Sequence, residues 1–257
     1  MNYFFAIKNE FLNCFLTIPR FKNSQIVDKN YLLYSAKIFN NQWLIEEKCS
    51  KKNSDFFFLE NEELDNSQIF FLAKKEHLSN NKYFIELKNL NSFTDTMPDF
   101  RSNLKIEIKD KGFSSYQSDY PYNLCKKKGS ILSPISILLE KNADKNYLFF
   151  KNIYIKPVKE EFYIYFINLK KKIVLEKKKV ITNHTNQIEI ESKFINSDTY
   201  IFSDKFLGVP IYVSIKNNHI SMEHTHPPHL YIWGNDKFTK VTELKNKINE
   251  IIIKKNL

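Results

Sequence analysis

The sequence predicts an all-β protein, mainly antiparallel, built as two sandwich-like β domains with a C-terminal α-helix. Most apolar segments are short, rich in aromatic and β-branched residues, and bounded by clusters of Asn, Lys, Asp and Ser, which is typical of strands and turns. Their spacing is close to the regular interval of a sandwich or barrel. Only the C-terminal segment repeats apolar residues at three- and four-residue steps over a long stretch, which predicts a helix.

The first half of the chain contains a series of expected strands and no long helix. The strands cover residues 3–7, 12–18, 31–39, 43–46, 55–59, 69–73 and 83–87. A polar stretch from 89 to 102, with Asp95, Pro98 and Asp99, then interrupts the pattern. We place a boundary in this stretch, which gives an N-terminal sandwich-like domain over residues 1–95 and a C-terminal β domain over 96–257.

The second half resumes with an expected strand at 104–108, followed by an irregular region at 110–136. Further strands are expected at 147–155, 161–168, 173–176, 180–182, 187–191, 199–202 and 210–215. Residues 169–172 read as a turn that joins two antiparallel strands. The lysine runs 170–172 and 177–179 flank this hairpin and indicate a solvated edge that resists aggregation.

The C-terminal helix is expected at 236–254. Asn235 or Asp236 can cap its first turn. Apolar residues then form one stripe, namely Phe238, Val241, Leu244, Ile248, Ile251 and Ile252. Such a stripe packs on a sheet face or on a partner, and we expect packing on the core.

The formal net charge of +10 raises nucleic acid or an anionic surface as a partner. Of the 39 basic residues, however, only Arg20 and Arg101 are arginine, the side chain best suited to bidentate phosphate and guanine contacts. Nucleic-acid binding is therefore the weakest of our hypotheses. The chain also has only 4 glycines, so we expect those that remain to meet a backbone requirement.

The sequence indicates a cytoplasmic protein. Cys14, Cys49 and Cys125 are widely spaced, odd in number and without a Cys-x-x-Cys pair, which fits a reducing compartment. Lys8 and Glu10 interrupt the apolar start of the chain before a signal-peptide core is reached. We expect no membrane span, because no uncharged apolar run reaches about 18 residues.

A histidine cluster is the most compact candidate site. His219, His224, His226 and His229 lie close together in the sequence. We expect a strand at 211–215, a tight turn at 217–218 and a second strand at 219–226, which carries the first three of these histidines. On a regular strand His224 and His226 share one face at about 7 Å, which suits two imidazoles that converge on one metal ion.

A third ligand completes this metal hypothesis. Pro227 and Pro228 stiffen the chain before His229, which would return to the same zinc or iron ion and leave one position open for water. Glu223 falls on the opposite face, so it would be a metal ligand only if the strand bulges. In the enzyme hypothesis it is the expected general base. A hydrogen-bonded structural crossover and a ligand- or anion-binding loop without metal are the alternatives.

The second candidate site lies in the irregular region. Tyrosines there alternate with small polar groups, the mixture that sugars and peptides require, and Arg101 lies just upstream. The expected ligand-binding residues are Arg101, Tyr116, Gln117, Asp119, Tyr120 and Tyr122. The alternatives are a plain crossover or disorder, and for Arg101 a structural ion pair with Asp119.

Three functions remain open. The chain has neither the glycine-rich phosphate loops of nucleotide-binding enzymes nor a Gly-x-Ser-x-Gly elbow. We therefore favour a non-catalytic binding or assembly module that recognises a glycan, a peptide or a partner protein. The alternative is a metal-dependent hydrolase with His224, His226 and His229 as ligands. A nucleic-acid-binding protein comes third.

Overall fold

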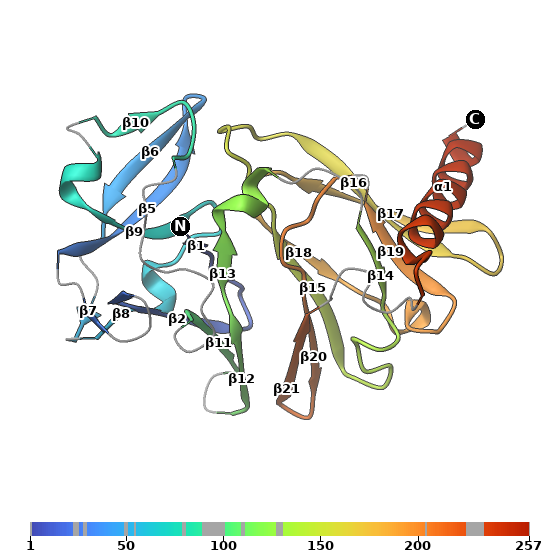
Figure 1. Ribbon diagram of the computed structural model, residues 1–257. Coiled ribbons are helices and arrows are strands. Elements are labelled where there is room, and N and C mark those ends of the chain that lie inside the picture. The colour runs from blue at the N-terminus through green and yellow to red at the C-terminus, as the bar shows by residue number, and fades with distance from the viewer. Residues whose placement is uncertain are drawn as a thin grey trace.

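A computed structural model confirms the predicted fold class: antiparallel strands form four sheets, and one α-helix follows them near the C-terminus (Figure 1). The structure describes residues 2–22, 26–27, 30–48, 51–53, 55–78, 81–88, 101–108, 111–126, 131–203, 205–224 and 234–256. All statements below about residues that are absent or unpaired refer to these ranges.

The first sandwich consists of two sheets and a small separate ribbon. The six-stranded sheet has the order β10 (Tyr83–Phe84), β6 (Gln42–Glu47), β5 (Tyr31–Phe39), β9 (Ile69–Lys74), β1 (Asn2–Phe4) and β13 (Asp119–Pro121). The five-stranded sheet has the order β12 (Phe113–Gln117), β11 (Asn103–Glu107), β2 (Asn13–Pro19), β8 (Phe56–Leu59) and β7 (Lys51–Lys52). The ribbon pairs β3 (Phe21–Lys22) with β4 (Ile26–Val27).

The alternation of buried and partly exposed side chains determines which face of each strand packs on the core. In β2, Cys14, Leu16 and Ile18 are buried while the residues between them are partly exposed, as expected for a sheet with one face on the core. β9 has apolar residues on both faces and is an interior strand, which pairs with β5 on one side and β1 on the other.

Strands from beyond residue 96 also belong to the first sandwich. β11 pairs with β2, and β13 pairs with β1, so strand partners change between β13 and β14 (Ile131–Pro134). The boundary that we placed in the polar stretch falls largely on residues 89–100, outside the described ranges. The region that we expected to be irregular contains β12, β13, a single 3-10 turn at Tyr122–Lys126, and β14.

The second sandwich consists of two four-stranded sheets. One has the order β14, β19 (Thr199–Ser203), β16 (Glu161–Asn168) and β17 (Ile173–Ile181). The other has the order β18 (Thr185–Glu189), β15 (Lys145–Lys151), β20 (Ile211–Lys216) and β21 (His219–His224). The predicted turn joins β16 to β17, and Lys172 within it has a positive φ of 55°.

The sheet β18-β15-β20-β21 lies between two hydrophobic cores. Tyr147 and Phe149 of β15 pack into the core of the first sandwich, whereas Leu148 and Phe150 pack into the core of the second. In Figure 1 this sheet stands beside β12 and β13, the edge strands of the first sandwich. The two sandwiches are therefore joined through continuous apolar packing.

The helix α1 (Lys237–Asn256) confirms the prediction for the C-terminus, and it covers the outer face of the second sandwich (Figure 1). Ile248 is buried against Ile167, Val174 and Phe202 of the sheet, and Leu244, Ile251 and Ile252 pack beside it. Among the described residues, no helix combines the length and the apolar character needed to cross a membrane.

Candidate functional site

The hairpin β20–β21 carries the start of the histidine cluster. Asn217 and Asn218 both have positive φ, 48° and 67°, which is the conformation of a two-residue type I′ turn. Met222 is buried and His224 half-buried, while Glu223 is exposed. This pattern agrees with the expected strand register, which placed Glu223 on the face opposite His224.

The structure brings the two predicted sites side by side. β12 lies next to β21, and the rings of Tyr116 and His224 are 4.6 Å apart at 34°. Arg101 donates a hydrogen bond from Nη1 to Oε1 of Gln117 at 2.7 Å. Burial, partly offset by Arg101, raises the pKa of Tyr116 to about 12, so this phenol is protonated at neutral pH.

The metal hypothesis stays a prediction. In the part of the chain that the structure describes, no three His, Cys, Asp or Glu side chains are grouped so that they could hold a metal ion. His226 and His229, two of the three expected ligands, lie outside the described residues.

The remaining expected ligand-binding residues have different environments. Asp119 is buried, and burial raises the pKa of its carboxyl to about 6. Tyr120 is fully buried, and its hydroxyl accepts a hydrogen bond from the Ile153 N–H at 3.1 Å. Tyr122 is half-buried and lines a groove. Tyr120 therefore contributes to the contact between the sandwiches, and only Tyr122 reaches the groove described next.

This groove was not predicted from the sequence. It consists of two adjoining hollows of about 660 Å³ and about 440 Å³, which share Ile85 and Glu86. The larger is lined by Gln42, Asn81, Tyr83, Phe84, Ile85, Glu86, Leu87, Lys88 and Tyr122. The smaller is lined by Asn41, Ile85, Glu86, Lys156, Pro157, Val158 and Lys159. Its walls therefore come from both sandwiches.

Hydrogen bonds fix the wall formed by β10 and the residues after it. The Ile155 carbonyl accepts bonds from the Leu87 N–H at 2.9 Å and from Nε1 of Trp43 at 2.8 Å. The Tyr3 hydroxyl donates to the Lys88 carbonyl at 3.1 Å. Because Trp43 and Tyr3 belong to the core, these bonds tie the wall to the buried core of the first sandwich.

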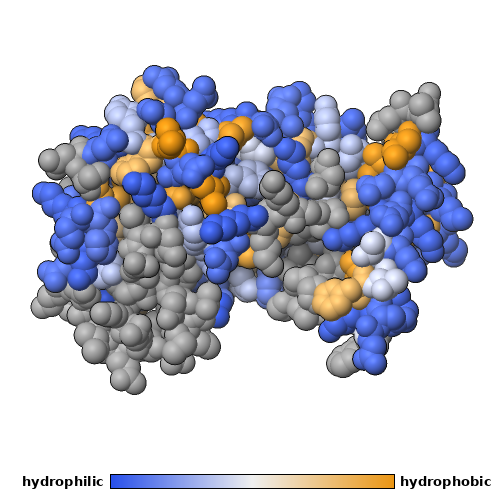
Figure 2. Space-filling model, turned by 45° about the horizontal axis from the view of Figure 1, so that its top comes forward, coloured by the Kyte–Doolittle hydropathy of each residue, from blue (hydrophilic) through white to orange (hydrophobic). Residues whose placement is uncertain are grey.

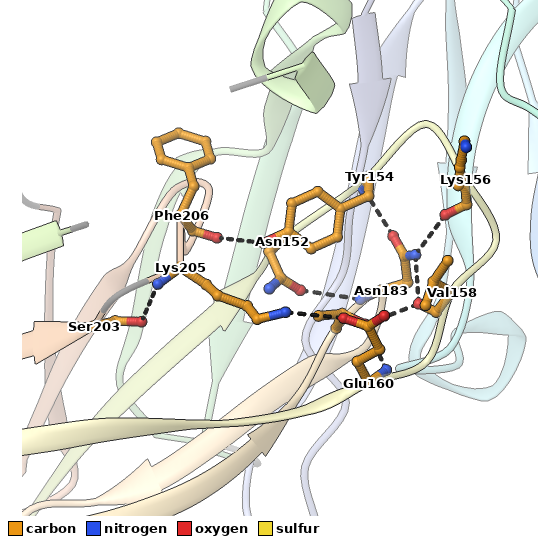
Figure 3. Close-up of polar contacts among 10 residues, drawn as sticks. Asn152, Tyr154, Lys156, Val158, Glu160, Asn183, Ser203, Lys205 and Phe206 are labelled. Atoms are coloured by element: carbon orange, nitrogen blue, oxygen red, sulfur yellow. Dashed lines mark hydrogen bonds and ion pairs between the residues drawn. The ribbon is translucent and has the colours of Figure 1, made fainter. Parts of the chain in front are cut away.

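Asn183 fixes the opposite wall (Figure 3). Its Nδ2 donates to the carbonyls of Lys156 at 3.1 Å and Val158 at 2.8 Å, and its Oδ1 accepts from the Tyr154 N–H at 2.8 Å. Asn183 is buried in the turn between β17 and β18 with a φ of 53°, a conformation that asparagine tolerates better than most residues. The wall is therefore preformed.

Apolar side chains are exposed along the groove. Ile85 is 73% exposed, and Tyr83 and Val158 are also exposed; Phe39 lies beside Tyr83, with ring centroids 6.4 Å apart. The top of Figure 1, where β10 and β6 lie, faces forward in Figure 2, and hydrophobic side chains gather there among hydrophilic ones. Apolar groups clustered in this way mark interaction surfaces more often than isolated ones do.

A sequence signal for the groove was present. Residues 83–87 read Tyr-Phe-Ile-Glu-Leu, with apolar side chains on both faces of a short strand. Tyr83 and Phe84 form β10 at the edge of its sheet, and Ile85, which follows them, remains exposed. Comparisons of the chain with protein-family models, curated proteins and solved structures found no match.

Proposed function

We propose that this chain is a non-catalytic binding module that holds an extended segment of a partner protein in the groove between its two sandwiches. The observation that carries the proposal is the exposed apolar row of Tyr83, Ile85 and Val158 within a preformed groove. Apolar and aromatic side chains in fixed positions supply most of the binding energy at protein interfaces.

The shape of the groove favours a chain segment over a small molecule. Sites for small molecules enclose most of the ligand surface, whereas this groove is open along its length and lined on both sides by exposed lysines. The buried, unbridged Cys14 and Cys125 support our expectation that the module acts in the cytoplasm.

Substitution of Ile85 tests this function. An array of defined peptides that vary in charge and hydrophobicity, with defined glycans beside them, is probed with the wild-type chain and with Ile85→Ser. We expect peptide ligands whose affinity falls at least about tenfold in Ile85→Ser, because the variant loses apolar contact at the centre of the groove.

The matched control is Ile137→Ser, since Ile137 is 64% exposed and lies in a turn that does not line the groove. We expect Ile137→Ser to bind like the wild type. Equal losses in both variants, or ligands that are glycans alone, would contradict the proposal. The hydrolase alternative also needs His226 and His229, which lie outside the described ranges, and metal analysis of untagged protein tests it separately.

A further inference from the structure

The groove carries positive charge that the described residues do not neutralise. Lys88, Lys156 and Lys159 line it and are exposed, and Glu86 is the only acidic residue among the described lining residues. None of the three lysines forms an ion pair with a described residue.

The carboxylate next to Lys159 in the chain already forms an ion pair with another lysine. Glu160 follows Lys159 directly in the chain, but its Oε2 lies 2.9 Å from Nζ of Lys205 (Figure 3). The charge of Lys159 also affects a neighbouring side chain. Burial lowers the pKa of His184 most, the charge of Lys151 comes next, and the charge of Lys159 lowers it further. The wall at 156–159 therefore presents an uncompensated positive potential to the groove.

Lysine ammonium groups also lie over aromatic rings at the other wall. Nζ of Lys88 is 4.9 Å from the ring centroid of Phe84, and Nζ of Lys126 is 5.1 Å from that of Tyr122. Such cation–π contacts limit the freedom of the long side chains and keep each charge beside an apolar surface. A ligand that meets this wall encounters positive charge and apolar surface together.

We propose that the occupant of the groove is an acidic, extended peptide segment of a partner protein. Its carboxylates lie near Lys88, Lys156 and Lys159, and its apolar side chains cover Ile85 and Val158. This inference rests on the proposed function, to which it adds the chemical class of the partner. It follows from charge complementarity, which determines partner choice and association rate at protein interfaces.

The experiment uses a labelled peptide of alternating Glu and Leu residues, and fluorescence anisotropy measures its affinity for the full chain. The test variant is Lys88→Glu/Lys156→Glu/Lys159→Glu. The control is Lys141→Glu/Lys170→Glu/Lys171→Glu, which changes the net charge equally at exposed lysines outside the groove. We expect affinity to fall at least about tenfold in the test variant and to change little in the control.

Further measurements in the same experiment distinguish an acidic peptide from other ligands. The wild-type affinity should fall as salt rises, because exposed charges are screened. If the test variant does not fold, the Lys→Gln triple replaces it, with a smaller loss expected. Equal losses in test and control variants, or tighter binding of an oligouronate or a single-stranded oligonucleotide, would overturn the acidic-peptide assignment. If array peptides depend on Ile85 but are neutral or basic, this inference fails while the proposed function stands.

Discussion

Lys151 shows how a single residue ties the two sandwiches together. The side chain is fully buried, and its Nζ donates to the Asn66 carbonyl at 2.9 Å and to the Gln68 carbonyl. The Asn66 side chain in turn exchanges hydrogen bonds with the backbone of Lys8, each at 2.8 Å. A lysine of β15 thus binds a loop of the first sandwich, and its buried amino group is tolerated because backbone carbonyls accept its hydrogen bonds.

The pH dependence of folding tests this arrangement. Burial lowers the pKa of Lys151 from 10.5 to about 7, so between these values the unfolded chain holds a proton that the folded chain lacks. The free energy of unfolding should therefore rise with pH across this window, by an amount on the order of a few kcal/mol. Lys151→Met should lose this rise, which urea unfolding at a series of pH values from 7 to 10 measures.

Lys145→Met is the control, since Lys145 lies on the same strand and is exposed. It should keep the slope of the wild type. Parallel curves for the wild type and Lys151→Met would mean that Lys151 titrates in the folded protein as it does in the unfolded chain.

We expected the few glycines to meet a backbone requirement, and Gly112 and Gly208 do so because a Cβ at either position would clash with backbone. A Cβ on Gly112 would lie 2.4 Å from the Asn218 carbonyl oxygen, where the tip of β11–β12 meets the turn of β20–β21. A Cβ on Gly208, which has a φ of +80°, would lie 2.2 Å from the Lys151 carbonyl oxygen. The sequence indicated that such positions matter, but it did not reveal which segments meet there, because those contacts join distant parts of the chain.

At the scale of elements, prediction worked best where the pattern is local. The β20–β21 hairpin follows from an Asn-Asn turn between apolar strands, and α1 follows from its apolar stripe. β12 was missed because Phe113–Gln117 is mostly polar and half exposed, so it lacks the apolar–polar alternation that marks a strand. Its pairing with β11 supplies the stabilisation that its own sequence does not predict.

The contact of α1 with the sheet can be tested at one position. Ile248→Ala should reduce the free energy of unfolding by about 2–4 kcal/mol, because it leaves a cavity among Ile167, Val174 and Phe202. Ile253→Ala on the same helix should cost less than about 0.5 kcal/mol, since Ile253 is 59% exposed. Chemical denaturation of both variants measures the difference, and equal costs would show that the helix does not pack as described.

At the scale of the whole molecule, the groove arises where the two sandwiches meet. Its lining comes from residues 41–42, Asn81, 83–88, Tyr122 and 156–159, segments that are distant in sequence and adjacent only in the fold. Local sequence patterns predicted the individual strands, but they do not predict which sheet edges of the two sandwiches lie side by side. The same reason explains why the polar stretch at 89–102 did not coincide with the change of strand partners, since β11 and β13 return to the first sandwich.

The central claim is that the groove is the binding surface. The most direct test compares backbone hydrogen exchange of the chain with and without the bound Glu/Leu peptide. Mass spectrometry resolves exchange by segment, and bound backbone and covered walls exchange more slowly. We predict slower exchange in residues 81–88 and 152–160, with no change in 113–117 and 219–224. Slower exchange at 113–117 and 219–224, with the groove segments unchanged, would place binding at the contact between Tyr116 and His224 and contradict the claim.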